Sequence, residues 1–371
     1  MTQWTRRAVL KSSSLAAGAS LLPAAGAAEH AVSPDPKLIY LNLNENAFGP
    51  SPRVPDAIQR ELSRVSRYAD ASSAQAFAEQ IAAYERVPVD QIVLGEILGA
   101  LGLYLGSKGG PGGEFIYSTP GYLALIDAAS HVGGVGIPVP LDAEYKNDLP
   151  ALAARVNSKT RALYLINPHN PTGTVSDDPS FKHFLREASQ KAPVIVDEAY
   201  LEYTPDFETR SAVSLVREGA DVLVFRTFDK IHGLAGLPIG YSIVPRALGE
   251  ALREQGVGDA ESLGRLNIAA ASAALADRTH VQQVRSVVAA EHKKWGAVLD
   301  DLKLKRTDSQ ANFIFFNAGR PQELVAGAMR DRGVVIGRLF PPYTNWVRIT
   351  IGRPEENSAA HESLRAIFQG I

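Results

Sequence analysis

Short apolar runs alternate with segments of helical periodicity along most of this 371-residue chain. The runs are nearly continuous in apolar character and rich in β-branched and aromatic residues; they lie at 92–94, 114–117, 135–139, 162–166, 194–196, 222–225 and 240–244. Strands of this kind belong to a sheet that is covered on both faces, and such sheets are mostly parallel because helices form the connections. The chain is therefore predicted to be an α/β protein.

The pattern changes after residue 263, and a second, smaller lobe is predicted there. Long helical patterns cover 267–276 and 280–302, and short strands are expected at 312–316, 334–336 and 346–351. An extended polar lip at Leu41–Asn46 is expected to complete this lobe. A chain of this length exceeds one ordinary domain, which agrees with two lobes.

Charge and composition exclude several functions. The formal net charge is -2 and no basic stripe is present, so nucleic-acid binding is not expected. The chain has no cysteine, which excludes disulfides and thiolate chemistry. Its eight histidines show no metal-binding spacing, so no metal is predicted. His169 and His232 fall in loops, where a lone histidine is expected to be a polar surface residue.

The first residues are predicted to be a targeting segment, not part of the fold. Arg6 and Arg7 precede an apolar, alanine-rich run at 14–25, and Ala25-Gly26-Ala27 offers a small-residue cleavage site. This resembles a twin-arginine (Tat) export signal, so residues 1–27 are expected to leave and the mature protein to be periplasmic. A disordered tail or a membrane anchor is the alternative, although the run is short for a membrane span.

One lysine stands in a setting that favours chemistry. Lys230 follows the apolar run at 222–225 and precedes the small-residue turn Gly233-Leu234-Ala235-Gly236. An amine in such a place can be shielded from water, which lowers its pKa and lets it act as a nucleophile toward an aldehyde. Most lysines, in contrast, are solvated surface charges. Two further motifs precede it, Asn-Pro-His-Asn-Pro-Thr-Gly at 167–173 and Val-Ile-Val-Asp-Glu-Ala-Tyr at 194–200.

In this order and spacing, the motifs resemble those of the fold-type I aminotransferases, which use pyridoxal 5'-phosphate. The histidinol-phosphate aminotransferase-like branch is most similar, because Asn44-Glu45-Asn46 and Gly352-Arg353-Pro354-Glu355-Glu356 are typical of it. The resemblance implies a large domain with a mostly parallel seven-stranded sheet and a smaller α/β C-terminal domain. The expected ranges are 28–60 for an N-terminal arm joining the small domain, 61–265 for the large domain and 266–371 for the small one.

The resemblance assigns roles around the cofactor ring. Lys230 is implied to be the Schiff-base lysine and the base that moves the substrate α-proton. Asp197 is implied to keep the ring nitrogen protonated; a cationic partner is expected for it, because a buried unpaired carboxylate is costly. A turn or capping aspartate is the alternative. Tyr200 and Asn170 are implied to donate to the ring oxygen, and Tyr122 to stack on the ring or else to be a core tyrosine.

Other positions match the substrate and phosphate ends of the family's site. Arg348 is implied to bind the substrate carboxylate bidentately, with Arg338 and Asn46 also on the substrate side. Thr227 and the backbone of Ile97 and Leu98 are implied to hold the cofactor phosphate. Tyr68 matches a tyrosine that reaches the phosphate in the other subunit, which implies a homodimer.

The chain departs from the family pattern at the phosphate end. The turn expected to carry a small hydroxyl residue reads Leu-Gly-Glu-Ile-Leu-Gly-Ala at 94–100, and Glu96 adds a carboxylate. Pro238 stands where an arginine is expected, and Asp229 replaces a small hydroxyl residue beside Lys230. Loss of a charged contact to phosphate is expected to weaken cofactor binding by about 2 kcal/mol or more.

These departures leave alternatives to an aminotransferase acting on an amino acid and a keto acid. One alternative is another outcome of the same cofactor chemistry: decarboxylation, elimination, racemisation or O₂-dependent oxidation. The other is a non-catalytic homologue. The joint presence of Lys230, Asp197, Tyr200 and Asn170 argues against the second, because a decayed site has no need of all four.

Overall fold

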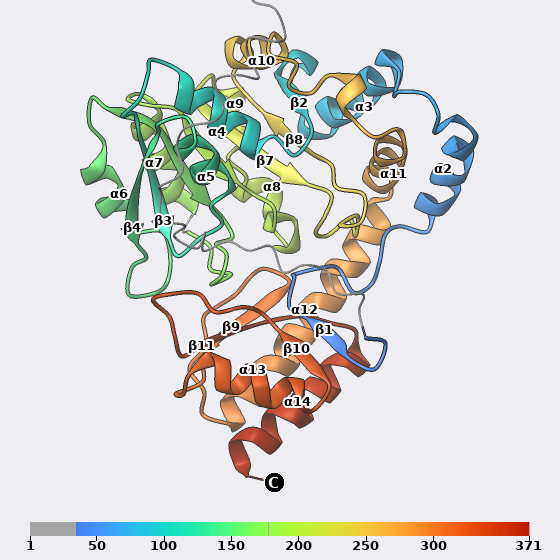
Figure 1. Cartoon of the computed structure of the whole chain (residues 1–371), viewed down its shortest axis with the longest axis vertical. Helices are drawn as coiled ribbons and strands as arrows, with labels where there is room; N and C mark the ends of the chain where they lie inside the picture. Colours follow the sequence, from blue (N-terminus) through green and yellow to red (C-terminus); the bar gives the residue numbers. More distant parts are fainter. Residues whose placement is uncertain (1–34, 177, 371) are drawn as a thin grey trace, which may run out of the picture. The chain divides into compact units, whose positions relative to one another are not determined.

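The seven apolar runs form one seven-stranded sheet, as predicted. In the computed structural model, which describes residues 35–176 and 178–370, the strand order is β2-β8-β7-β6-β5-β3-β4 (Figure 1). The strands are β2 (Ile92–Leu94), β3 (Glu114–Thr119), β4 (Val135–Pro140), β5 (Thr160–Ile166), β6 (Val194–Asp197), β7 (Val222–Thr227) and β8 (Gly240–Ile243). Only β8 runs antiparallel to its neighbours β7 and β2; the other pairs are parallel.

The central strands are apolar throughout because helices cover both faces of the sheet. On β5, Leu163 and Leu165 face a core that includes side chains of helices α3, α7, α9 and α11. Ala162 and Tyr164 face a second core that includes side chains of α4, α5 and α10. Successive side chains of a strand point to opposite faces, so a strand buried on both sides shows no polar alternation.

The helices of this part of the chain are short to medium in length. They are α2 (Arg53–Glu61), α3 (Ala71–Glu85), α4 (Leu98–Ser107), α5 (Ala124–Ser130), α6 (Leu149–Arg155), α7 (Asp178–Ser189), α8 (Phe207–Arg210), α9 (Val213–Arg217), α10 (Arg246–Arg253) and α11 (Arg265–Leu275). Within residues 35–176 and 178–370, no helix combines the length and the apolar character that crossing a membrane requires.

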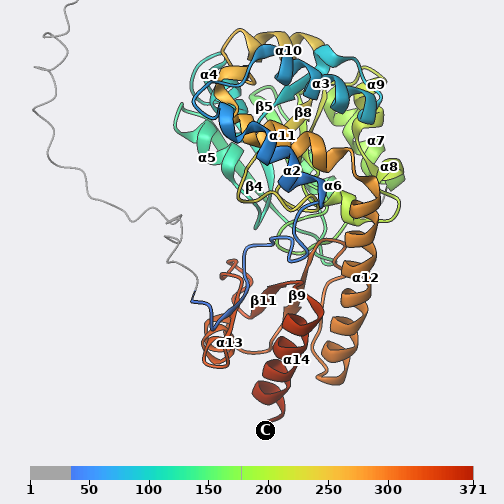
Figure 2. The same cartoon turned by 90° about the vertical axis from the view of Figure 1, so that its right-hand side faces the viewer.

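The C-terminal part contains two further two-stranded sheets. β9 (Phe313–Asn317) pairs antiparallel with β11 (Trp346–Thr350), and β1 (Ile39–Leu41) pairs in parallel with β10 (Val334–Ile336). The helices α12 (Arg278–Asp301), α13 (Gln322–Arg330) and α14 (Pro354–Gln369) pack around a core that contains the fully buried Trp295. Figure 2 shows α12 running beside β9 and α14.

The N-terminal lip therefore joins the C-terminal sheets, with strand β1 placed just before the expected range. The predicted helix at 280–302 begins earlier, at Arg278, because the Asp277 side chain caps it by accepting from the backbone N–H of His280. The domain boundaries at residues 60 and 265 stay predictions. From Leu38 onward the chain forms one compact unit, and the targeting segment at 1–27 lies outside the described residues.

Candidate active site

The ends of the central strands bring the predicted motifs to one edge of the sheet. Strands β5, β6 and β7 are parallel neighbours. Asp197 is the last residue of β6, and the segments that follow β5 and β7 carry Asn170 and Lys230. Ligands of open α/β sheets gather at this carboxyl edge. Strand β2 also points this way, since β8 is antiparallel to both β7 and β2, so Glu96 ends at the same edge.

Asp197 is buried, with 4% of its surface exposed, and neutral donors hold its carboxylate. The Tyr164 hydroxyl donates to Oδ2 at 2.9 Å and the backbone N–H of Ala199 donates to Oδ1 at 3.0 Å. Burial raises the pKa of Asp197 to about 6, and the charge of Lys230 opposes that rise. Across the described residues, no ion pair to Asp197 is formed, so a cationic ring nitrogen would complete its surroundings.

Tyr200 and Asn170 are arranged so that each keeps a donor free. The Tyr200 hydroxyl oxygen accepts from the Asn44 side-chain amide at 3.1 Å, which leaves its proton available. The Asn170 side-chain oxygen accepts from Nη1 of Arg348 at 2.7 Å, which leaves its amide N–H groups available. Each residue therefore keeps a donor for a ligand.

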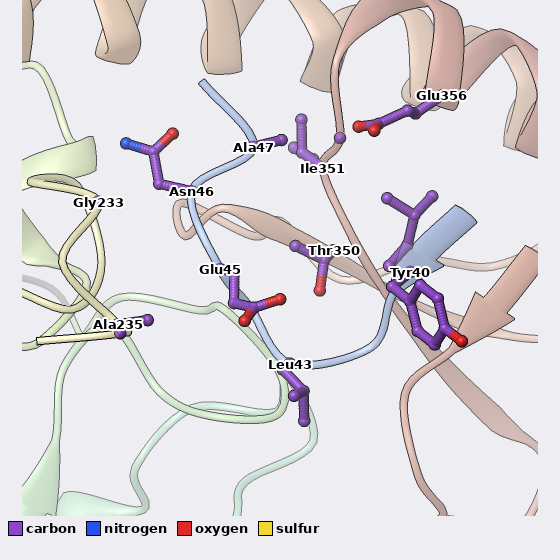
Figure 3. A pocket seen from close by; sticks show the side chains of 13 residues that line it. Tyr40, Leu43, Glu45, Asn46, Ala47, Gly233, Ala235, Thr350, Ile351 and Glu356 are labelled. Carbon is purple, nitrogen blue, oxygen red and sulfur yellow. The ribbon is translucent and has the colours of Figure 1, made fainter. Parts of the chain in front are cut away.

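Lys230 lies half-buried in the turn between β7 and β8, and the lip is fastened to this turn. The side-chain amide of Asn46 donates to the carbonyl of Ile231 at 2.8 Å. Gly233 has φ of 71°, and a Cβ there would lie 2.6 Å from the carbonyl carbon of Gly49. Figure 3 shows Asn46 on the lip beside the loop that carries Gly233, around a cavity of about 310 Å³.

Arg348 offers a buried guanidinium that also contacts the lip segment. Its Nη2 donates to the carbonyl of Asn42 at 3.0 Å, while Nε has no hydrogen-bond partner in the described part of the chain. Burial, together with the nearby charge of Arg338, lowers the pKa of Arg348 to about 10, so it remains a cation at neutral pH. Both guanidinium groups lie within 5 Å of the Phe340 ring centroid, and Arg338 is exposed.

The predicted phosphate end carries an added carboxylate, Glu96, and has Pro238 where an arginine is expected. The Thr227 hydroxyl donates to Oε1 of Glu96 at 2.7 Å, and Ile97 and Leu98 follow at the start of α4, where no side chain caps the helix. The carbonyl of Pro238 accepts from the side chain of Asn267 at 2.9 Å.

Two predicted aromatic residues differ in their relation to this site. Tyr122 is 49% exposed, and the charges of Asp197 and Glu96 help to raise the pKa of its hydroxyl, after partial burial as the main cause. Its predicted stacking role stays a prediction. Tyr68 is 79% exposed, and nothing in the described chain brings it to Lys230.

Sequence reasoning missed Tyr164 and misjudged two histidines. Tyr164 reaches Asp197 only because β5 pairs with β6, and a single apolar run carries no signal of that pairing. His169 and His232 are buried, contrary to the expected surface placement. Burial lowers the pKa of His169 to about 3, and Nε2 of His232 lies 3.5 Å from Oε2 of Glu202.

A seven-stranded α/β sheet with a lysine after β7 and a buried aspartate at the end of β6 defines the class of fold-type I pyridoxal-phosphate transferases. Solved structures agree. The chain is similar to a putative histidinol-phosphate aminotransferase from Erwinia carotovora atroseptica (TM-score 0.83, 27% identity, 90% of this chain and 96% of that one). It is also similar to the histidinol-phosphate aminotransferase of Sinorhizobium meliloti in complex with pyridoxal-5'-phosphate (TM-score 0.79, 26% identity, 90% and 91% covered).

The chain belongs to the family "Aminotransferase class I and II", whose model matches residues 36–364. Among curated proteins it is 33% identical to a histidinol-phosphate aminotransferase of Moorella thermoacetica, over 89% of this chain and 86% of that protein. It is 33% identical to an aromatic amino acid aminotransferase of Thermobifida fusca, over 88% and 90%. The protein is thus an aminotransferase, and pyridoxal 5'-phosphate is its cofactor.

The ring end of the site fits this cofactor. The buried carboxylate of Asp197 lacks a cation, Tyr200 and Asn170 keep free donors, and Lys230 has no hydrogen bond or ion pair of its side chain within the described residues. The phosphate end offers Thr227 and the start of α4, but with the Glu96 carboxylate between them.

Proposed function

We propose that the protein transfers the amino group of an amino acid to a keto acid, with Lys230 as the amine that bonds the cofactor and then serves as base. The observation that carries the proposal is the buried, unpaired Asp197 at the same strand edge as Lys230. When bound, pyridoxal 5'-phosphate supplies a ring that accepts electrons from the substrate α-carbon. Asp197 keeps the ring nitrogen charged, and Nζ of Lys230 takes and returns the α-proton.

The direct test is spectroscopic. The purified protein is expected to gain visible absorbance on addition of the cofactor, and Lys230→Ala is expected to lose it while remaining folded by circular dichroism. Lys182→Ala, which removes a lysine from α7, serves as the control and should behave as wild type. Equal spectra for wild type and Lys230→Ala would contradict the role of Lys230.

The substrate is proposed to carry a carboxylate. Arg348 supports this because its guanidinium is buried, cationic and has an unpartnered Nε, which suits bidentate binding of a carboxylate. The relatives' names suggest two kinds of amino donor, histidinol phosphate and aromatic amino acids. Only the amino acids carry a carboxylate, so they are the proposed donors and histidinol phosphate is the comparison. A panel of both, assayed for keto product that depends on an added keto acid, distinguishes transamination from decarboxylation, elimination, racemisation or oxidation.

Export through the twin-arginine route is proposed from Arg6, Arg7 and the run at 14–25. Residues 1–31 fused to a reporter that acquires its cofactor in the cytoplasm should deliver it to the periplasm. Substitution of both arginines by lysine should retain the reporter in the cytoplasm. Cytoplasmic retention of the unchanged fusion would refute export.

A homodimer with shared sites is proposed from the resemblance at Tyr68, which is exposed in the single chain. Sedimentation should give twice the chain mass. Tyr68→Ala should weaken cofactor binding without changing the mass, whereas the same change at the exposed Tyr40 should not weaken it. A monomeric wild type would overturn the proposal.

A further inference from the structure

The Glu96 carboxylate contacts Thr227 at the predicted phosphate end of the site. It accepts from the Thr227 hydroxyl at 2.7 Å, and this hydroxyl in turn accepts from the backbone N–H of Asp229 at 3.0 Å. Both hydrogen-bonding functions of Thr227 are therefore used within the protein. Glycine at position 240 leaves room for this arrangement, since a Cβ there would lie 2.7 Å from Oε1 of Glu96.

The surroundings of this carboxylate are acidic. Partial removal from water raises the pKa of Glu96 to about 7, and the charges of Asp229 and Asp197 add to the rise. The hydrogen bond from Thr227 and the charge of Lys230 oppose it. Glu96 is nevertheless accessible at the mouth of a cavity of about 370 Å³. No lysine, arginine or histidine of the described chain lines that cavity.

The order of the strands decides which end of the cofactor meets Glu96. In a pyridoxal ring the nitrogen lies opposite the aldehyde carbon, and the ring oxygen and the phosphate arm lie on opposite sides of that axis. Asp197 ends the middle strand β6; Asn170 follows β5 on one side, and Thr227 ends β7 on the other. If Asn170 holds the ring oxygen, Thr227 and Glu96 would be the residues nearest the phosphate.

We propose that Glu96 fills the phosphate end of the cofactor site and thereby reduces the preference of this protein for pyridoxal 5'-phosphate over phosphate-free pyridoxal. The inference rests on the proposed use of Lys230 and Asp197 at the ring. A carboxyl group that takes the Thr227 donor leaves the phosphate without that donor, and in its ionised form it places a like charge beside the phosphate. Pyridoxal, whose arm ends in a hydroxyl, meets no such repulsion.

The experiment compares dissociation constants of the two compounds by titrating purified apoprotein and following visible absorbance. Glu96→Ser removes the carboxylate and should tighten pyridoxal 5'-phosphate about ten- to a hundredfold, while pyridoxal changes by about twofold or less. Glu96→Gln keeps the shape and removes the charge, so it should move the ratio in the same direction by a smaller factor. Glu187→Ser, at an exposed position of α7, should leave both constants unchanged.

The outcomes separate this inference from the proposed function. A ratio of the two constants that is the same in wild type, Glu96→Ser and Glu96→Gln overturns the role of Glu96 while leaving Lys230 chemistry intact. Binding of neither compound by any of the proteins overturns the proposed function and this inference together. A ratio of the two dissociation constants that changes in the Glu96 variants but not in Glu187→Ser supports the inference. A purely structural role of Glu96 would not produce this result.

Discussion

Nη2 of Arg226 donates to Oε2 of Glu198 at 3.0 Å, and both side chains are almost completely removed from water. Arg226 also lies 3.2 Å from Oε1 of Glu85, a carboxylate of α3 that accepts from the Tyr241 hydroxyl. Glu198 receives two more donors, from Ser211 and from the backbone of Ala212. This buried network ties β7 to Glu198, the residue that follows Asp197 in the chain.

Removal of the arginine from this network should therefore be severe. Arg226→Met leaves two buried carboxylates without a cation and is expected to lower the free energy of unfolding by about 3–5 kcal/mol. Arg186→Met breaks an exposed pair with Glu218 at 2.9 Å and should cost less than about 1 kcal/mol. Urea denaturation of both variants measures the difference, and similar midpoints would contradict this account of the network.

The contact between the Lys230 turn and the lip gives a second prediction. Gly233→Ala forces a side chain into a left-handed position and against Gly49, so a loss of about 1–3 kcal/mol is expected together with weaker cofactor binding. Gly236→Ala lies in the same turn with open space around it and should change stability by less than about 0.5 kcal/mol. Thermal unfolding and cofactor titration of the pair test this. Equal effects would mean that the contact with the lip is unimportant.

The buried carboxylate of Asp197 predicts a stability that depends on pH. Its pKa rises from 3.8 to about 6 on folding, so ionisation of Asp197 destabilises the folded apoprotein. The free energy of unfolding falls as the pH rises from about 3.8 to about 6, and the full loss is present at higher pH. Asp197→Asn should therefore be more stable than wild type by about 3 kcal/mol near pH 8 and by almost nothing near pH 3.5. Denaturation of the two apoproteins across this range is the measurement. A difference that does not vary with pH would exclude ionisation as its cause.

The geometry of Arg348 predicts a specific kinetic defect. Arg348→Lys keeps the positive charge but loses the two parallel N–H donors of the guanidinium. For amino acid donors, kcat/KM should therefore fall about ten- to a hundredfold. For the amine that corresponds to the same donor without its carboxylate, kcat/KM should fall little. The dissociation constant of the cofactor should change about twofold or less. An equal fall in kcat/KM for both donors would show that Arg348 does not bind the substrate carboxylate.

The sequence predicted the elements whose signals are local. The run Val194–Val196 reads as a strand because both of its faces are buried, and Asp197 stands out because it ends such a run. Contacts that depend on strand order could not be predicted in this way. Thr227 and Glu96 are 131 residues apart, and Tyr164 meets Asp197 only through the pairing of β5 with β6. The burial of His169 likewise depends on how its loop folds back, which no short motif encodes.

The pairing of β1 with β10 has a consequence for the timing of assembly. Residues 39–41 are among the first of the described chain to leave the ribosome, yet their partner strand at 334–336 is among the last. The lip that holds Tyr200 through Asn44 and the Lys230 turn through Asn46 cannot be fixed before then. The pocket beside the lip is therefore completed only when translation is nearly finished.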